Sequence, residues 1–220
     1  MENVWSRPRR APRQTLTLER IVTEAVALLD EEGVARLTMR RLAERLGTGS
    51  TTLYWHVRTK DDVLDLALDA VFGEVPEPAR PPGASWREPV RALMGGWRAA
   101  LLRHPWSATV LDRPLLGPNA LARTEFLFQA LAAAGLAAPA TAAHALSNYV
   151  MGSVLMQVTW QDRGGAGSGA FLRERAARYP ALAEHGLDPE WDAVFAEGLG
   201  HLLAGMEEAR RLTTRTPPPA

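Results

Sequence analysis

The side chains with the clearest chemical use lie together in one short segment, residues 50–57, which reads STTLYWHV. The hydroxyls of Thr51 and Thr52 can exchange hydrogen bonds, and the tyrosine, tryptophan and histidine that follow add ring and polar groups. A surface helix without a partner normally carries Lys and Glu, and this segment has neither. Such side chains suit a helix that lies against phosphate oxygens and base edges of DNA.

Two short helices around a glycine-containing turn are predicted to position this segment. Residues 38–46 place apolar side chains at i, i+3, i+4 and i+7, with three arginines and a glutamate opposite. Gly47 and Gly49 interrupt that helix, and a second one is predicted from Ser50 to about Val57. Two helices joined in this way can present the second to a major groove.

The second helix divides by face. Leu53 and Val57 stand four residues apart and are predicted to pack inward on the first helix, whereas Thr51, Thr52 and Trp55 point the other way. The competing interpretation makes the Tyr-Trp pair core aromatics, since burial is the commoner use of these residues. We favour the DNA interpretation because the inward face already has its two apolar residues.

Chemistry then suggests a role for each outward side chain. Thr51 and Thr52 can bond to bases or contact a thymine methyl group, and Arg40 can bind O6 and N7 of guanine. Tyr54, His56 and Lys60 are suited to the phosphate backbone. The N-terminal arm holds four more arginines, for which DNA contact and a solvated tail stay equal alternatives: Arg7, Arg9, Arg10 and Arg13.

Helical periodicity and capping signals continue through the rest of the chain. Helices are predicted over residues 18–32, from a Thr59–Asp62 capping box to about 75, and over 85–104, 119–134, 138–162 and 189–211. We therefore expect an all-α fold in which a three-helix helix-turn-helix domain precedes a larger helical domain. The expected divisions are a disordered basic arm (1–16), the helix-turn-helix domain (17–62), a ligand-binding and dimerisation domain (63–212) and a disordered tail (213–220).

Charge is distributed unevenly although the 220 residues carry a net charge of +0. Residues 1–60 hold eleven Lys and Arg against seven Asp and Glu, which gives +4, and the remainder carries −4. A positive end can attract phosphates, although chance asymmetry stays an alternative. There is no cysteine, no secretory signal pattern and no apolar run of membrane-spanning length. We expect a cytoplasmic protein with no membrane partner.

Signals for an enzyme are weak. The five histidines form no i, i+3 or i+4 pair, so no helical metal site is indicated. Residues 165–170 formally match GxGxxA, but they follow a predicted helix without a βαβ unit, and Ser168 lacks the glycines of a nucleophile elbow. We predict no catalytic residues, no metal and no cofactor.

The segment LTMRRLAERLG-TGS-TTLYWHVRTKDDVL resembles the helix-turn-helix of the TetR family of one-component regulators. The stretches SWREPVRALMGGWRAALLRHP and ALSNYVMGSVL resemble its tetracycline-repressor type of C-terminal domain. The resemblance implies an all-α homodimer that binds a palindromic operator, takes a small-molecule inducer and dimerises through a four-helix bundle. It assigns base contacts to Arg40, Ser50, Thr51 and Thr52, and phosphate or sugar contacts to Thr38, Tyr54, Trp55, His56 and Lys60.

The ligand-binding part departs from the resemblance. Family members that bind a magnesium chelate use histidine and glutamate at positions matching Leu111 and Met156, and a further histidine where this chain has Pro76. Because magnesium requires oxygen ligands, we expect a metal-free, hydrophobic or aromatic effector. The candidate pocket residues combine aromatic, thioether and a few polar groups, and ordinary bundle core is the alternative for each: Trp97, Leu101, His104, Trp106, Phe126, Asn148, Met151, Met156 and Trp160.

Taken together, these patterns predict a ligand-responsive transcriptional repressor that a small apolar or aromatic molecule releases from DNA. An activator would carry the same motif. The alternative function is a helical protein-interaction or enzyme-like bundle that retains a vestigial helix-turn-helix.

Overall fold

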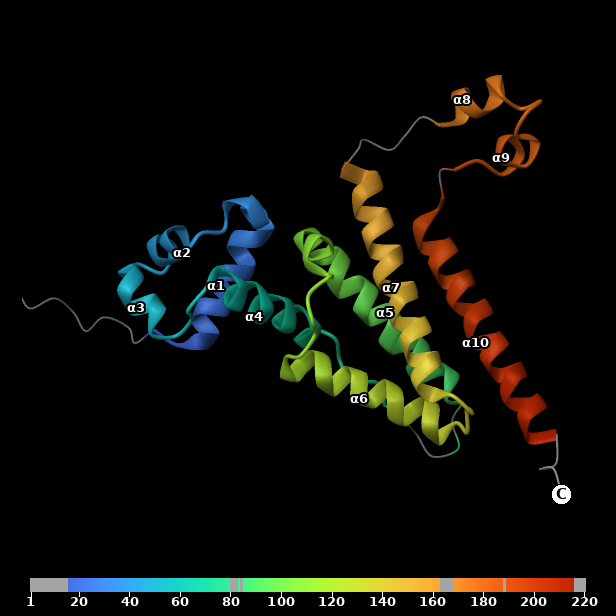
Figure 1. Cartoon of the computed structure of the whole chain (residues 1–220), viewed down its shortest axis with the longest axis horizontal. Coiled ribbons are helices and arrows are strands. Elements are labelled where there is room, and N and C mark those ends of the chain that lie inside the picture. The colour runs from blue at the N-terminus through green and yellow to red at the C-terminus, as the bar shows by residue number, and fades with distance from the viewer. Residues whose placement is uncertain (1–15, 80–82, 84, 163–167, 188, 216–220) are drawn as a thin grey trace, which may run out of the picture. The chain divides into compact units, whose positions relative to one another are not determined.

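The computed structural model describes residues 16–79, 83, 85–162, 168–187 and 189–215, and its regular elements in these ranges are all helices (Figure 1). The predicted all-α fold is confirmed. The chain forms two compact units, Met1–Ala67 and Leu68–Ala220, and the boundary between them falls within one helix. Of the predicted arm over residues 1–16, only Leu16 lies within the described residues, where it is buried.

The first unit contains α1 (Leu18–Glu32), the 3₁₀ turn η2 (Val34–Arg36), α2 (Met39–Arg45), α3 (Ser50–Tyr54) and the start of α4 (Lys60–Gly73). Its core is the apolar stripe of α1 together with the inward residues of the next two helices: Ile21, Ala25, Leu28, Leu29, Leu42, Ala43 and Leu53. Met39, the first apolar position predicted for the helix over residues 38–46, is only half-buried because it occupies the first position of α2. The regular part of α3 is shorter than predicted, since a turn replaces the helix at Trp55 and His56.

Side-chain caps define where these helices begin. The Thr38 hydroxyl accepts a hydrogen bond from the Arg41 amide at 3.1 Å. Before α4, the Asp62 amide donates to Thr59 Oγ1 at 3.0 Å, and the Thr59 amide donates to the Asp62 carboxylate at 3.1 Å. This reciprocal pair is the predicted capping box, and its hydrogen bonds lower the pKa of Asp62.

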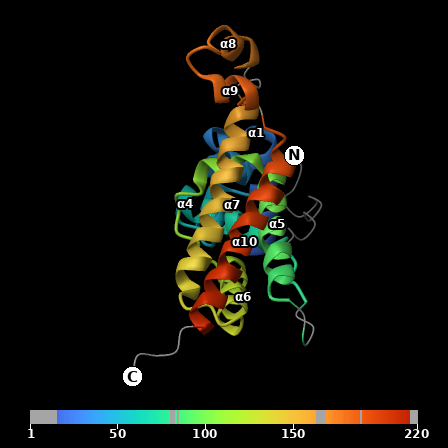
Figure 2. The same ribbon diagram turned by 90° about the vertical axis from the view of Figure 1, so that its right-hand side faces the viewer.

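The second unit contains the end of α4, then α5 (Arg87–Arg103), the 3₁₀ helix η3 (Pro105–Val110), α6 (Pro118–Ala133), α7 (Pro139–Asp162), α8 (Ser168–Glu174), α9 (Pro180–His185) and α10 (Trp191–Arg215). α7 packs against α5, α6 and α10 and is therefore the central helix of this unit. Figure 2 shows α7 and α10 side by side. The last helix continues beyond its expected end, and residues 216–220 of the expected tail lie outside the described residues.

α8 and α9 were not expected from the sequence. They contact each other and lie beyond the adjoining ends of α7 and α10 (Figure 1). Short helices of this kind produce too few periodic positions to be recognised in a sequence, and Pro180 and Gly186 bound the second of them closely.

The two faces of α3 should differ in their contribution to stability. Leu53 is fully buried, so Leu53→Ala is expected to lower the free energy of unfolding by about 2–5 kcal/mol. Trp55 is 85% exposed, so Trp55→Ala should change it by no more than about 0.5 kcal/mol. Urea denaturation followed by circular dichroism measures both values. Similar losses for the two variants would show that Trp55 belongs to the core.

Candidate functional site

The turn between α2 and α3 fixes the direction of α3. Gly47 has a φ of +66°, the left-handed conformation that favours glycine after a helix. The Thr48 amide donates to the Ala43 carbonyl at 3.0 Å, and the Gly47 amide donates to the Glu44 carbonyl at 3.1 Å. These two bonds form a Schellman motif, which satisfies carbonyl groups at the end of α2 and turns the chain into α3.

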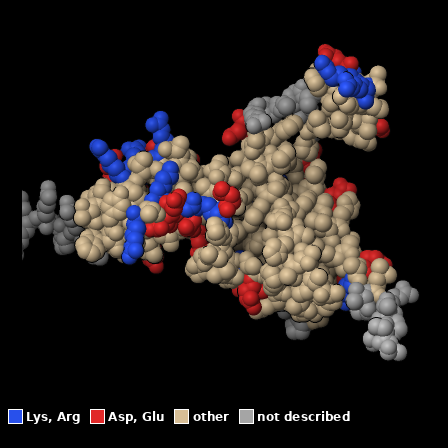
Figure 3. Space-filling model, in the orientation of Figure 1, with Lys and Arg blue, Asp and Glu red and all other residues tan. Residues whose placement is uncertain are grey.

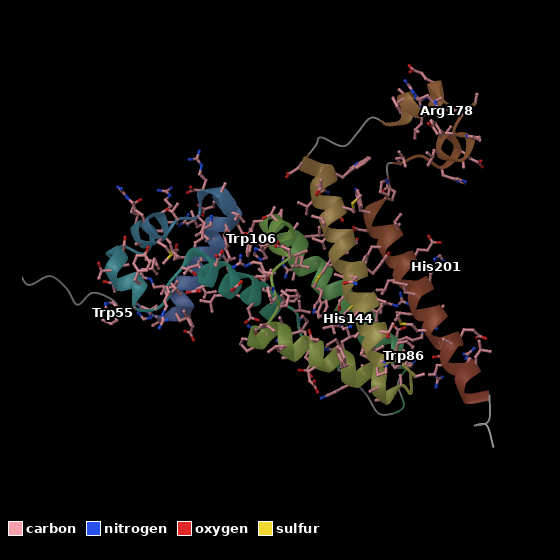
Figure 4. All side chains as sticks on the ribbon, in the orientation of Figure 1. Trp55, Trp86, Trp106, His144, Arg178 and His201 are labelled. Atoms are coloured by element: carbon pink, nitrogen blue, oxygen red, sulfur yellow. The ribbon has the colours of Figure 1, made fainter. Side chains whose placement is uncertain are left out.

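The predicted division of α3 by face is confirmed. Leu53 and Val57 are buried, whereas Thr51, Thr52 and His56 are exposed. The two aromatic side chains are also exposed, Tyr54 to 49% and Trp55 to 85%. Figure 4 labels Trp55 at the outside of this unit. α3 contacts α2, so its inward residues are held in the core of the first unit. Trp55 is the most exposed large apolar side chain among the described residues.

Residues 46–57 carry no Asp, Glu, Lys or Arg, and the surface over α3 is correspondingly free of charged side chains in Figure 3. Arg40 lies at its border, 86% exposed, and its Nε donates to Glu44 Oε1 at 3.0 Å. Lys60 is more firmly held, since its ammonium donates to the Val34 carbonyl at 2.7 Å. Hydroxyl and aromatic groups thus form the centre of this surface, with cations at its edge.

Two other arginines of α2 serve the scaffold. Arg41 binds Glu32 at 2.7 Å, and Arg45 binds both Glu31 and Glu24, so these ion pairs tie α2 to α1. Hydrogen bonds from Arg45 lower the pKa of Glu31, and the same pairing raises that of Arg45. These cations already have carboxylate partners. Arg40, whose pairing is the most exposed, is therefore the α2 arginine best placed to take another ligand.

The remaining predicted DNA-binding residues lie at helix starts. The Thr38 hydroxyl oxygen accepts the capping bond at the start of α2, which leaves its own O–H available as a donor. Ser50 is half-buried at the first position of α3. The structure thus brings the predicted base and phosphate contacts onto α2, α3 and the start of α4. The arginines of the N-terminal arm lie outside the described residues.

Five of the predicted pocket residues are buried in the second unit: Trp97, Leu101, His104, Trp106 and Phe126. Trp97 packs edge-on against Phe72 with ring centroids 5.5 Å apart, and its indole Nε1 is buried with no hydrogen-bond partner. His104 packs edge-on against Trp106 at 6.2 Å and lies 2.9 Å from Glu74 through Nε2. Burial acts to raise the pKa of Glu74, but hydrogen bonds from Arg103 and His104 lower it overall.

The other four pocket candidates lie on α7 and divide between two cavities. Asn148, Met156 and Trp160 line a cavity of about 530 Å³ between α7 and the start of α10. Met151 lines another, together with Leu111. Neither cavity is lined by the five buried residues, so the nine candidates do not form one site.

Sequence reasoning missed three aromatic residues of the α7–α10 cavity: Tyr149, Trp191 and Phe195. Tyr149 stacks on Phe195 at 5.4 Å and donates from its hydroxyl to the Phe195 carbonyl at 3.1 Å, and burial raises its pKa. Arg98 lies 4.8 Å from the Phe195 ring. Trp191 and Phe195 were missed because helical spacing alone does not show which face of α10 turns toward α7.

Among the described residues, no three His, Asp or Glu side chains are grouped so that they could hold a metal ion. Within the same ranges, none of the helices is long and apolar enough to span a membrane.

Comparison with known proteins identifies both parts of the chain. Residues 21–67 match the family model "Bacterial regulatory proteins, tetR family", and residues 77–210 match "Tetracyclin repressor-like, C-terminal domain". An HTH-type transcriptional regulator of Saccharopolyspora erythraea is 51% identical over 92% of this chain and 90% of its own length. The HTH-type transcriptional repressor DrrR1 of Streptomyces coeruleorubidus is 35% identical over 94% of this chain and 84% of its own.

Solved structures agree with this assignment. Apo ActR of Streptomyces coelicolor, a TetR family protein, matches with a TM-score of 0.81 at 33% identity, covering 91% of this chain and 99% of that chain. Its complex with actinorhodin matches with a TM-score of 0.78, covering 90% and 99%. The protein therefore belongs to the TetR family of bacterial transcriptional regulators, which bind DNA through a helix-turn-helix and are not enzymes.

Proposed function

We propose that this regulator is a ligand-responsive repressor that binds a palindromic operator as a homodimer in the cytoplasm. The main support for the proposal is the outward face of α3, which presents exposed hydroxyl and aromatic side chains and has no carboxylate. Leu53 and Val57 hold the opposite face in the core, so α3 can enter a groove without loss of packing. The DrrR1 relative is named as a repressor, which supports repression over activation.

Base reading is assigned to Arg40, Ser50, Thr51 and Thr52. Arg40 pairs with Glu44 only at the exposed surface, where an ion pair contributes about 0–1 kcal/mol, so its guanidinium can exchange that partner for guanine. The exposed hydroxyls of Thr51 and Thr52 can donate to or accept from base edges.

Phosphate and sugar contacts are assigned to Thr38, Tyr54, Trp55, His56 and Lys60. Thr38 can donate its hydroxyl hydrogen to phosphate while it still caps α2. The exposed rings can pack against the sugar–phosphate backbone, and Lys60 can supply positive charge from its position beside Val34. These contacts set the register of α3 and do not themselves read sequence.

A homodimer follows from the proposed palindrome, since each half-site takes one α3. α7 and α10 are the proposed dimerisation helices. They lie side by side and expose large apolar side chains that a second copy would cover: Leu155, Met156, Val194 and Leu212.

The proposed effector is a hydrophobic or aromatic molecule bound in the second unit without a metal ion. Leu111 and Met156 cannot ligate magnesium, and Leu111 lines a cavity with Met151 and Leu155. The similar protein ActR was solved in complex with actinorhodin, which supports a small-molecule effector for this chain. An effector that prefers a DNA-incompatible conformation must weaken operator affinity. By thermodynamic linkage, operator DNA then weakens the affinity for the effector by the same factor.

Footprinting tests the DNA proposal. The purified protein should protect a palindromic site near its own gene at moderate salt, with two half-sites about one helical turn apart. Absence of any protected palindrome would refute the proposal.

Variants should separate base contacts from backbone contacts. Arg40→Ala is expected to cost about 1–3 kcal/mol and to relax preference at one base pair, because Arg40 is proposed to read a single guanine. Tyr54→Ala should weaken binding to all DNA sequences alike. Fluorescence anisotropy with single-base operator variants measures the difference. Equal losses on every sequence for Arg40→Ala would make Arg40 a phosphate contact.

A thermal-shift screen of aromatic natural products, with actinorhodin included, should identify effectors. A hit is expected to raise Tm and to release the operator, and both effects should persist in excess EDTA because no metal takes part. Loss of the effect on chelation would contradict metal-free recognition.

A further inference from the structure

A side chain of α4 caps the start of α6, and a side chain of α6 caps the end of α4. α6 begins after Gly117, which has no side chain to cap it, and its first residue, Pro118, has no amide hydrogen. The next two amides point to a carboxylate on α4. Asp69 accepts from the Ala120 amide at 2.9 Å and from the Asn119 amide at 3.3 Å. A residue of another helix thus performs the function of an N-cap side chain.

The opposite cap runs from α6 back to α4. α4 has no basic residue in its last turn, where a cation would interact favourably with the free carbonyl groups. Arg123 of α6 supplies this cation. Its Nη2 donates to the Gly73 carbonyl at 3.1 Å and to the Val75 carbonyl at 2.8 Å, and its Nε donates to the Val75 carbonyl at 3.0 Å. The planar guanidinium places two nitrogens, Nε and Nη2, on the Val75 carbonyl at once, and the single nitrogen of a lysine cannot reproduce that paired contact.

Close backbone approach makes these two caps possible. A Cβ atom at Gly117 would lie 2.2 Å from Asp69 Cγ and 2.6 Å from its Cβ, so any side chain there would displace the carboxylate. A Cβ atom at Gly73 would lie 3.1 Å from the Asn119 side chain. Asp69 is also nine-tenths buried, which strengthens its hydrogen bonds and makes their loss costly.

We propose that Asp69 and Arg123 act as positioning residues for DNA binding, because their reciprocal caps make the end of α4 and the start of α6 move as one body. We call this pair the α4–α6 latch. The inference rests on the proposed operator binding. α4 is one continuous helix whose first residues belong to the unit that carries α3. Its far end is fixed by the latch within the second unit.

Loss of the latch should therefore weaken operator binding, although neither Asp69 nor Arg123 is proposed to contact DNA. A freed helix end samples more positions, and DNA binding must then restrict them again, which costs conformational entropy. Coupling of this kind commonly amounts to a factor of about five or more in affinity. The two residues should act as one unit, so the double variant should lose little more than either single variant.

Three variants break the latch by different means. Asp69→Asn keeps the size of the side chain but removes its charge, and Arg123→Lys keeps the charge but loses the bidentate contact. Gly117→Ala displaces Asp69 sterically, although the φ of −71° at Gly117 suits alanine. Amide hydrogen exchange over residues 119–121 should accelerate in Asp69→Asn and Gly117→Ala, which verifies that the cap at the start of α6 is broken. Anisotropy with the footprinted operator duplex should then show affinity at least about five-fold below wild type.

Ser107→Ala is the matched control. Ser107 is fully buried in the same unit and donates to the Leu101 carbonyl at 3.1 Å, so its loss costs a buried hydrogen bond that involves neither Asp69 nor Arg123. This variant should bind the operator as wild type does. Latch variants with accelerated exchange but wild-type affinity would overturn the proposal, as would an equal loss of affinity in Ser107→Ala. A wild-type protein that binds no palindrome would instead refute the proposed function, and the latch proposal with it.

Discussion

The burial of Leu53 and Val57 is the constraint on which the DNA-binding surface depends. Both side chains are removed from water, and α3 is too short to be stable as an isolated helix. Its structure therefore comes from packing on α2 and from the turn at Gly47. Because these two residues face inward, the helical repeat places Thr51, Thr52 and Trp55 on the outward face. The chemistry of the surface is a consequence of the core.

The ion pairs of α2 follow the same division. Arg41 and Arg45 pair with glutamates of α1 and hold the scaffold, whereas Arg40 lies at the border of the uncharged surface with an exposed partner. A similar separation occurs in the second unit. Buried aromatics such as Trp97 build its core, while Asp69 and Arg123 use backbone polar groups to fix the ends of two helices. Apolar burial supplies stability in both units, and directed polar contacts set where the functional helices lie.

Much of this organisation could be predicted from the sequence because its signals are local. The Thr59–Asp62 capping box and the inward pair on α3 depend on spacings of three and four residues, and both were confirmed. The latch could not be predicted, since Asp69 and Ala120 are 51 positions apart and nothing in either segment indicates the other. The position of each candidate pocket residue, in the core or at the surface, could not be predicted either. Trp97 and Met156 both look apolar and helical, but one is core and the other lies at the surface.

Amide chemical-shift mapping of the protein with a short operator duplex tests directly whether the outward face of α3 binds DNA. We expect the largest shifts at the exposed positions of residues 50–56, with further shifts at Thr38, Arg40 and Lys60. Those shifts should weaken as salt is raised, since phosphate contacts release counterions. Shifts confined to the second unit, or a first unit that does not respond to the duplex, would contradict DNA binding through α3.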